Sequence, residues 1–434
     1  MQTSANFFFK KKILIYGLGI SGISSLNFLK KNNSVKFYDD IKKFNSKSLS
    51  KFFIKKDKIN SYKFDLIILS PGINFEKCGL QTYLKKNKKK IYTDLDIFYS
   101  YFNKNKIIAI TGTNGKSTTV QLLSDILNLS KKDARAVGNI GRGILNEKKI
   151  SKNTIFVVET SSYQIEYSKI FKPNLALLLN ISPDHLDRHK TFKNYLRSKL
   201  KLFYNQTEKD FAFFNKNNLL IKKEIRNLKI NSSRVHVDGK LKNSQRKLIT
   251  NNYLKTLNNE ENLSFIFAVC KKLKIKEKFI FKAINLFKGL KFRQEIIYQS
   301  KKLTIINDSK STSFSSSKNL LKSLNRVHWI LGGLPKKGDK FIFEKNRKQK
   351  IKAYIFGSFK KFYINNLKNK IAFETFNNVK FAFKKSISEI KKLNVKKHQT
   401  ILFSPCSASF DEFKNFEERG KYFNFLVKKE KIRI

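Results

Sequence analysis

The sequence has few of the residues that mark several common classes of protein. It contains 3 cysteines, 5 prolines, 1 methionine and 1 tryptophan among 434 residues. Cys78, Cys270 and Cys406 are far apart and odd in number, which excludes a disulfide framework and a CxxC metal site. No apolar run approaches the about 20 residues of a membrane helix, and the apolar patch at 7–9 precedes the lysines at 10–12, the reverse of the order in a signal peptide. We therefore expect a reduced, soluble protein of the cytoplasm that does not insert into a membrane.

Acidic residues are also scarce relative to basic ones. The chain has 91 lysines and arginines against 32 aspartates and glutamates, a formal net charge of +59. Such a charge is typical of proteins that bind nucleic acids or anionic membranes. The lysines are dispersed, however, and their abundance beside 41 phenylalanines is typical of a coding sequence that drifts towards A and T. We expect no specific nucleic-acid partner, only non-specific affinity for polyanions at low salt.

Apolar runs that end in glycine, serine or aspartate turns recur along the chain and define three blocks. The predicted strands are 13–16, 35–38 and 66–69 in the first block, 107–110, 155–158 and 175–179 in the second, and 303–306, 327–331, 353–356 and 400–403 in the third. This alternation of strand, turn and helix predicts an α/β protein with mainly parallel sheets. Helices are expected up to Leu29, over 191–203 and over 262–273, and the serine-rich run 309–317 is expected to be a loop and helix N-cap. The polar stretch 205–250 has only weak periodicity and is not assigned.

The most informative segment is the apolar run 107–110, which breaks into a glycine-lysine-serine turn. Glycines let backbone N–H groups close around phosphate oxygens, and a helix N-terminus adds its positive dipole end. Lys116 can reach the outer phosphates, and the hydroxyl of Ser117 can ligate Mg²⁺. The glycine that a standard phosphate loop has five residues before Gly115 is replaced by Ile110, which indicates a narrower family than the generic ATPases. The predicted ATP-binding residues here are Gly112, Thr113, Asn114, Gly115, Lys116, Ser117 and Thr118.

A second glycine motif lies near the N-terminus, where Gly17, Gly19 and Gly22 follow the first predicted strand and Asp39 ends the second. The pattern is typical of a dinucleotide site, with Asp39 on a ribose. It serves equally for any nucleotide diphosphate at a helix N-terminus, or simply for tight packing of a helix against a strand. Because the stronger nucleotide site follows at residue 111, we favour a nucleotide-linked substrate over a redox cofactor.

Polar side chains also follow the predicted strands of the second block. Glu159 comes directly after the strand 155–158, where an open α/β sheet often places a Mg²⁺ ligand. A surface carboxylate or a helix N-cap would give the same sequence pattern. The segment 180–189 contains two of the chain's 5 histidines. Metal ligation by His185 is one interpretation, whereas Asp187 and His189 are more typical of supporting residues.

Five segments, in order over nearly the full length, resemble the Mur ligases of peptidoglycan synthesis. They are 111–118 (Thr-Gly-Thr-Asn-Gly-Lys-Ser-Thr), 159–164 (Glu-Thr-Ser-Ser-Tyr-Gln), 180–188 (Asn-x-x-x-Asp-His-x-Asp-Arg), 307–312 (Asn-Asp-Ser-Lys-Ser-Thr) and 404–416 (Ser-Pro-Cys-Ser-Ala-Ser-Phe-Asp-Glu-Phe-Lys-Asn-Phe). Residues 308–310 and 413–420 favour the members that add D-glutamate, and the Asp-Asn-Pro-Arg segment of the diaminopimelate-adding members is absent. The chain departs from the family at Asp40-Ile41, where Thr-Arg is common, and at Leu334-Pro335.

The resemblance implies three domains and a set of site residues. The expected domains are 1–93 for a UDP-sugar substrate, 94–289 for ATP and catalysis, and 290–434 for the incoming amino acid, the outer two Rossmann-like and the central one of the P-loop type. The implied catalytic residues are Lys116, Glu159, His185 and Lys199; the implied metal ligands are Ser117, Glu159, His185 and Lys199; further ATP contacts are Asn262, Arg293 and Asp308. The implied substrate contacts are Gly17, Gly19, Ser21, Gly22, Asp39, Ser70, Asn139, Lys310, Thr312, Lys336, Ser409 and Phe416.

The role of Lys199 is predicted from the resemblance alone, because nothing in the neighbouring sequence distinguishes it from the other lysines. The resemblance implies that CO₂ carbamylates it, which turns a cation into an anionic oxygen ligand for a second Mg²⁺. The implied activity is the ATP-dependent addition of D-glutamate to UDP-N-acetylmuramoyl-L-alanine through an acyl phosphate, by a cytoplasmic monomer that serves cell-wall synthesis, cell shape and division. The alternatives are a sibling ligase or folylpolyglutamate-type synthetase with another amino acid and, in a different class, a basic nucleic-acid-binding ATPase.

Overall fold

The computed structural model describes residues 7–41, 47–141, 143–251, 253–255, 257–336, 338–342, 350–392, 397–430 and 432. The chain divides into two compact units, Met1–Phe287 (unit 1) and Lys288–Ile434 (unit 2). Unit 1 contains two sheets and unit 2 contains one. Within the described ranges, no helix is long and apolar enough to cross a membrane.

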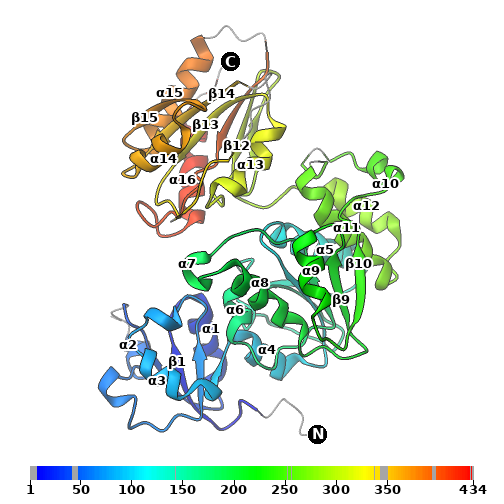
Figure 1. Ribbon diagram of the computed structural model, residues 1–434, viewed down its shortest axis with the longest axis vertical. Coiled ribbons are helices and arrows are strands. Elements are labelled where there is room, and N and C mark those ends of the chain that lie inside the picture. Colours follow the sequence, from blue (N-terminus) through cyan, green and yellow to red (C-terminus); the bar gives the residue numbers. More distant parts are fainter. Residues whose placement is uncertain are drawn as a thin grey trace. The chain divides into compact units, whose positions relative to one another are not determined.

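The first sheet of unit 1 is parallel, with the strand order β2-β1-β3-β4 (Figure 1, blue). Its strands and helices are β1 Lys12–Tyr16, α1 Ile20–Leu29, β2 Ser34–Tyr38, α2 Lys47–Ser50, β3 Leu66–Leu69, α3 Gln81–Lys86 and β4 Ile91–Tyr92. The three strands predicted from the sequence are confirmed, and α1 ends at Leu29 as expected. The short β4 was not predicted, because two residues carry no periodic signal.

The central sheet of unit 1 is also parallel, with the order β10-β9-β8-β5-β7-β6. Its strands are β5 Lys106–Thr111, β6 Ala134–Gly138, β7 Ile155–Glu159, β8 Leu175–Leu178, β9 Phe211–Asn215 and β10 Ser233–Val237. Its helices are α4 Asp94–Phe102, α5 Lys116–Leu129, α6 Ser162–Tyr167, α7 Leu186–His189, α8 Phe192–Leu200, α9 Leu219–Arg226, α10 Asn243–Leu248, α11 Leu257–Lys272 and α12 Glu277–Leu286. The predicted helix over 262–273 therefore starts five residues too late, and the unassigned stretch 205–250 contains two strands and two helices.

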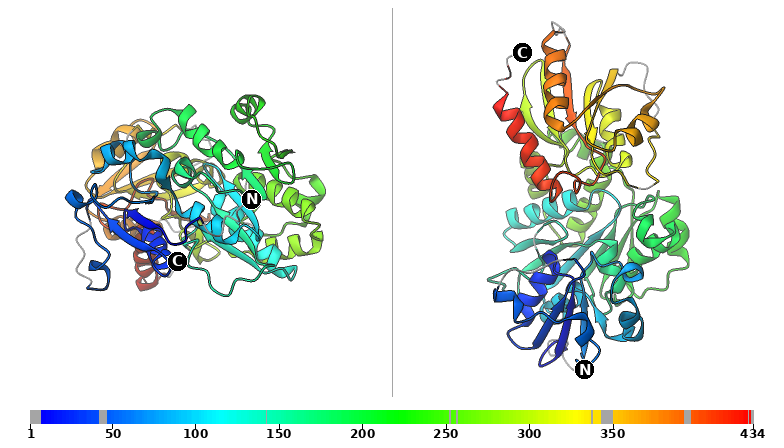
Figure 2. Two further views of the ribbon diagram at one scale, coloured as in Figure 1. Left: turned by 90° about the horizontal axis from the view of Figure 1, so that it is seen from below. Right: turned by 90° about the vertical axis from the view of Figure 1, so that its left-hand side faces the viewer.

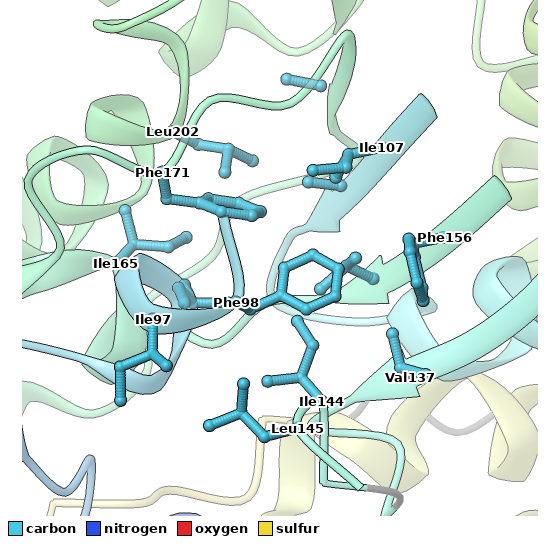
Figure 3. Close-up of a cluster of buried hydrophobic side chains, with 14 of the residues drawn as sticks. Ile97, Phe98, Ile107, Val137, Ile144, Leu145, Phe156, Ile165, Phe171 and Leu202 are labelled. Atoms are coloured by element: carbon cyan, nitrogen blue, oxygen red, sulfur yellow. The ribbon is translucent and has the colours of Figure 1, made fainter. Parts of the chain in front are cut away.

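One hydrophobic core runs through both sheets of unit 1. The same cluster of buried side chains contains Ile13 of β1 and Ile107 of β5, and α4 contacts both α1 and α6. Figure 3 shows the ring of Phe98, on α4, between Ile107 and Ile144. Its centroid is 4.8 Å from that of Phe156 on β7, in an edge-to-face arrangement. Helix α4 therefore joins the first sheet to the central sheet by packing.

Unit 2, coloured from yellow to red in Figure 2, contains one sheet. Its strand order is β11-β12-β16-β13-β14-β15, and of these strands only β11 is antiparallel to its neighbour. Its elements are β11 Glu295–Gln299, β12 Leu303–Asn307, α13 Phe314–Ser323, β13 Arg326–Gly332, β14 Lys350–Phe356, α14 Lys360–Leu367, β15 Ala372–Phe376, α15 Val379–Lys392, β16 Gln399–Phe403 and α16 Phe416–Lys429. The four predicted strands are confirmed, and Ser313 is the N-cap of α13, as the serine-rich run predicted. Strands β11 and β15 were not predicted, because they are half-exposed and do not form buried apolar runs.

Candidate active site

The phosphate loop follows β5 and leads into α5, as the sequence predicted. Gly112 and Gly115 have φ angles of +155° and +80°, which glycine adopts without strain. A Cβ atom on Gly115 would lie 2.0 Å from Oδ1 of Asn262, so a larger residue would have to displace the Asn262 side chain. That Oδ1 atom is buried and has no hydrogen-bond partner within the described part of the chain. An unsatisfied buried acceptor beside the loop suits a ligand that donates a hydrogen bond.

The loop is held from outside by Asn180, which follows β8. The backbone N–H of Thr113 donates to the carbonyl oxygen of Asn180 at 3.1 Å, and that of Asn114 donates to Oδ1 of Asn180 at 2.9 Å. Nζ of Lys116 donates to the carbonyl oxygens of Gly112 (2.9 Å) and Thr113 (2.8 Å). The lysine ammonium therefore lies over the loop itself. Sequence reasoning placed Lys116 here but missed Asn180, although it opens the segment 180–189 directly after a buried strand.

Glu159 lies at the C-terminal end of β7, beside the phosphate loop. Its side chain is buried, and Ser117 donates from Oγ to Oε2 at 2.5 Å. Asn139 donates from Nδ2 to Oε1 at 3.0 Å and from its backbone N–H to the carbonyl oxygen of Glu159 at 3.0 Å. The carboxylate thus brings together three predicted site residues from α5, β7 and the turn after β6. A hydroxyl and a carboxylate in contact are the hard oxygen ligands that Mg²⁺ prefers, so these residues fit the ion.

Lys199 is buried on the inner face of α8, only 2% exposed. Its Nζ donates to the carbonyl oxygen of Gly112 at 2.9 Å and to Oγ1 of Thr111 at 3.4 Å, and lies 4.8 Å from the centre of the Tyr195 ring. Burial, and secondly the charge of Lys116, hold the pKa of Lys199 well below that of an ordinary lysine, against the opposing effects of two carboxylates. A neutral amine is the form that reacts with CO₂, so the site fits a carbamylated lysine.

The two histidines of the segment 180–189 have different surroundings. His185 is half-exposed and in the left-handed region (φ +54°); its Nδ1 lies 2.9 Å from the hydroxyl of Tyr163 and its Nε2 lies 3.4 Å from Oδ2 of Asp184. His189 is buried, and its Nε2 lies 3.0 Å from Oγ of Ser162. Burial, with nearby positive charges, lowers the pKa of His189 to about 4, which keeps it neutral. In the described ranges, no group of three or more histidine, cysteine, aspartate and glutamate side chains could hold a metal, so a metal at Glu159 needs other donors, such as Ser117.

The N-terminal glycine motif forms a tight turn between β1 and α1. A Cβ atom on Gly22 would lie 2.0 Å from the carbonyl oxygen of Gly17, which itself accepts a hydrogen bond from Oγ of Ser70 at 2.6 Å. Oδ2 of Asp39 accepts from the backbone N–H of Leu18 at 2.7 Å. Asp39 and Ser70, two predicted substrate contacts, therefore also fix the turn.

Two neighbours of this turn make contacts that the sequence did not predict. Ser21, a predicted substrate contact, hydrogen-bonds the buried carboxyl of Asp94 at the start of α4. Asp40, at the departure from the family pattern, accepts from the hydroxyl of Tyr16 at 2.5 Å, while the side chain of Ile41 is 90% exposed. Arg188 donates from Nη1 to the carbonyl oxygen of Pro71 at 2.8 Å, which links α7 to the first sheet. The arginine was visible in the sequence motif, but its partner was not.

In unit 2, several predicted residues gather at the C-terminal ends of β12 and β16. Nζ of Lys310 lies 3.9 Å from the ring centre of Phe416, and Oγ of Ser309 donates to the carbonyl oxygen of Phe416 at 2.9 Å. Leu334 pairs with Ala408 through backbone hydrogen bonds in both directions, which brings the segment leading to Lys336 alongside that of the buried Ser409. Thr312 lies in the loop between β12 and α13, and Arg293 lies just before β11.

Asp308 is buried at the end of β12. It accepts from the backbone N–H of Gln294 at 3.1 Å and from Oγ of Ser404 at 2.8 Å. Burial raises the pKa of Asp308 to about 7 in spite of these bonds and of the charges of Arg293 and Arg419. Arg419, on α16, is 1% exposed and donates to the carbonyl oxygens of Ser309, Ser407 and Ala408 and to two serine hydroxyls. It joins the loops after β12 and β16, a role that no local sequence pattern predicted.

Residues 110–282 match the family model of the Mur ligase middle domain. The UDP-N-acetylmuramoylalanine–D-glutamate ligase of Rickettsia prowazekii is 33% identical to this chain. The alignment covers 98% of this chain and 99% of the Rickettsia protein. The ligase of the same name from Francisella tularensis is 33% identical over 96% of this chain and 95% of its own. Among solved structures, the MurC ligase of Thermotoga maritima, a UDP-N-acetylmuramate-alanine ligase, has the same fold with a TM-score of 0.56 at 17% identity, covering 97% of this chain and 100% of that one.

The chain belongs to the Mur ligase family. Within the family, the curated relatives that it matches from end to end carry the name of the D-glutamate-adding ligase, as the segments 308–310 and 413–420 predicted. The MurF ligase of Thermotoga maritima, solved in complex with ADP, also shares the fold, with a TM-score of 0.54 at 14% identity.

Proposed function

We propose that this chain is an ATP-dependent ligase that joins D-glutamate to UDP-N-acetylmuramoyl-L-alanine in the synthesis of peptidoglycan precursors. The observation that carries the proposal is the contact of Glu159 with Ser117 and Asn139 beside the phosphate loop, in a chain that matches D-glutamate-adding ligases along nearly its whole length. We further propose that it acts in the cytoplasm as a monomer, without a specific nucleic-acid partner.

In the proposed reaction, the carboxylate of the L-alanyl group attacks the γ-phosphorus of ATP, and ADP leaves. The amine of D-glutamate then attacks the acyl phosphate, loses a proton, and inorganic phosphate leaves as the amide forms. The backbone N–H groups of the phosphate loop and Lys116 stabilise the charge on the transferred phosphoryl group. The remaining residues bring the three reactants together, because catalysis of this kind depends mainly on positioning.

Ser117, Glu159, His185 and carbamylated Lys199 would hold Mg²⁺, with two ions expected. When bound, the ions neutralise the negative charge of the phosphates and the attacking carboxylate. The carbamate would form when the neutral amine of Lys199 adds to the carbon of CO₂ and releases one proton. The buried position of Lys199 and its lowered pKa support this proposal.

We propose the domain roles that the family implies: 1–93 for the UDP-sugar, 94–289 for ATP, and 290–434 for D-glutamate. The separate sheets support three domains, and the division into compact units after Phe287 lies close to the proposed boundary at 289. In this scheme Gly17, Gly19, Ser21, Gly22, Asp39, Ser70 and Asn139 serve the UDP-sugar; Asn262, Arg293 and Asp308 serve ATP; and Lys310, Thr312, Lys336, Ser409 and Phe416 serve D-glutamate.

A substrate panel tests the proposal. Purified protein is given ATP, Mg²⁺ and UDP-N-acetylmuramoyl-L-alanine with each candidate amino acid in turn, and phosphate release and the new amide are measured. We expect turnover with D-glutamate and only when the UDP-sugar is present. Activity with L-glutamate but not D-glutamate would indicate a folylpolyglutamate-type synthetase, and salt-resistant, DNA-stimulated ATP hydrolysis without the sugar would indicate a nucleic-acid-binding ATPase.

A further inference from the structure

Glu261, on α11 next to Asn262, connects the phosphate loop to the end of β9 through two asparagines. Nδ2 of Asn180 donates to Oε2 of Glu261 at 2.7 Å, and Nδ2 of Asn215, at the end of β9, donates to its Oε1. Glu261 is half-buried, and Asn215 is buried. One carboxylate therefore receives a hydrogen bond from each of two asparagines, one just after β8 and one at the end of the neighbouring strand β9.

The opposite end of each asparagine amide is also fixed. Oδ1 of Asn180 accepts from the backbone N–H of Asn114 in the phosphate loop at 2.9 Å. Oδ1 of Asn215 accepts from the backbone N–H of Asn217 at 2.9 Å. Both amides must therefore present their NH₂ groups to residue 261. A side chain at this position has to accept two hydrogen bonds and donate none.

Only a carboxylate meets that requirement at this length. Glutamine has the same shape, but it carries one acceptor and one donor, so one of its ends would face an NH₂ group. The orientation of the Asn180 amide matters because its two ends differ: Oδ1 can accept from the N–H of Asn114, whereas Nδ2 cannot. The loop that Asn180 holds is also the loop that Gly112 and Gly115 shape for phosphate.

We propose that Glu261 is a positioning residue for ATP: by fixing the Asn180 amide, it holds the phosphate loop in the conformation that receives the phosphates. It does not touch the ligand itself in this scheme. Helix α11 thus serves the nucleotide twice, through Glu261 behind the loop and through Asn262 beside Gly115. The proposal depends on the proposed function only for the identity of the nucleotide.

A donor–acceptor exchange tests it. Glu261→Gln should weaken ATP binding about 10-fold, which equals about 1.4 kcal/mol, because one NH₂ group then faces another. Adding Asn215→Asp should restore wild-type affinity, because the glutamine then accepts from Asn180 and donates to the new carboxylate, which still accepts from Asn217. Glu260→Gln is the matched control on the same helix, since Glu260 accepts from Leu241 and Arg246 instead. Affinity is measured by calorimetry with ATP and Mg²⁺ alone, and turnover by KM for each substrate.

The expected pattern is a rise in the Kd and KM for ATP in Glu261→Gln, with unchanged KM values for the other two substrates, and recovery in the double variant. Wild-type ATP affinity in a folded Glu261→Gln, or a double variant without recovery, would overturn the proposal. If Glu261→Gln does not fold, the double variant must still fold and bind ATP as the wild type does; its failure overturns the proposal too. Because binding is measured without sugar or amino acid, a protein that binds ATP but fails the substrate panel rejects the proposed function and not this one.

Discussion

Two buried basic side chains, Lys199 in unit 1 and Arg419 in unit 2, have very different surroundings in the interior of the protein. Arg419 donates five hydrogen bonds to carbonyl and hydroxyl oxygens of two loops. Lys199 has two acceptors, one at 2.9 Å and one at 3.4 Å. Burial lowers the pKa of Arg419 only to about 10, so it stays charged at neutral pH, whereas the pKa of Lys199 lies well below its ordinary value.

The two side chains differ in how far their hydrogen-bonding groups are satisfied, and this difference supports the proposal that Lys199 reacts with CO₂. A buried charge is tolerated when its hydrogen-bonding groups are satisfied, and the guanidinium of Arg419 meets that condition. The amine of Lys199 is under-satisfied, which favours its neutral form and leaves a lone pair for chemistry. Burial alone therefore does not reveal the role of a lysine or arginine; the number of acceptors around it does.

The largest expected effect follows the loss of Lys199. In Lys199→Ala we expect the rate of amide formation to fall by at least about 10³-fold, because an electrostatic group at the phosphate loop is lost. Added short-chain carboxylic acids should restore part of the rate by occupying the place of the carbamate. The measurement is phosphate release with and without the acid. Lys193→Ala, an exposed lysine on the same helix, is the control and should behave as wild type; no rate loss and no rescue in Lys199→Ala would remove the carbamate role.

Arg419→Met should instead affect stability. Removing the guanidinium leaves the carbonyl oxygens of Ser309 and Ser407 buried without donors, and we expect unit 2 to lose roughly 3–5 kcal/mol of unfolding free energy. The chain's 1 tryptophan, Trp329, is buried in unit 2 and donates to the carbonyl oxygen of Ser404, so its fluorescence in urea reports on this unit. Lys421→Met, exposed on the same helix, is the control. Equal stability of the two variants would contradict a structural role for Arg419.

The smallest effect concerns Asp308, which lies near Arg419 yet has a pKa of about 7. Because this pKa is raised above its ordinary value, the folded form binds more protons than the unfolded one; the stabilising contribution is full below about pH 4 and is lost as the pH rises through about 7. The Asp308→Asn variant does not lose this contribution. The free energy of unfolding of the variant, relative to that of the wild type, should therefore increase by roughly 2–3 kcal/mol between pH 4 and 7. The measurement is urea unfolding of Trp329 at each pH. Asp411→Asn, which removes an exposed carboxylate from the same unit, is the control, and parallel curves for Asp308→Asn and wild type would show that Asp308 does not titrate in this range.

The sequence predicted those parts of the site whose residues all lie in one short segment of the chain. The phosphate loop, Glu159 and the strands before them follow from local patterns, because a buried strand, a glycine turn and a helix start are all encoded within about ten residues. The burial of Lys199 could not be predicted from the sequence, because the residues that accept its hydrogen bonds lie in β5 and in the phosphate loop, far from Lys199 in the chain. Arg419 and Glu261 were missed for the same reason.

The stretch 205–250 shows the other limit of sequence reading. Its two strands are short and β10 is mostly exposed, so neither strand shows a strong alternation of apolar and polar residues. Yet β9 ends in Asn215, which contacts Glu261 and so reaches the phosphate loop in two steps. A segment without a visible pattern can therefore take part in a site when tertiary contacts, not local residues, set its role.

The position of Phe98 has a consequence for how the protein tolerates change. Its ring lies in a core that belongs to both sheets of unit 1 (Figure 3), so a substitution there disturbs the first sheet and the central sheet together. Helix α4 thus ties the first sheet and the central sheet to one set of apolar contacts. A substitution in the core of one sheet is therefore constrained by the packing of the other, and a fragment cut at residue 93 would lose the helix that packs against α1.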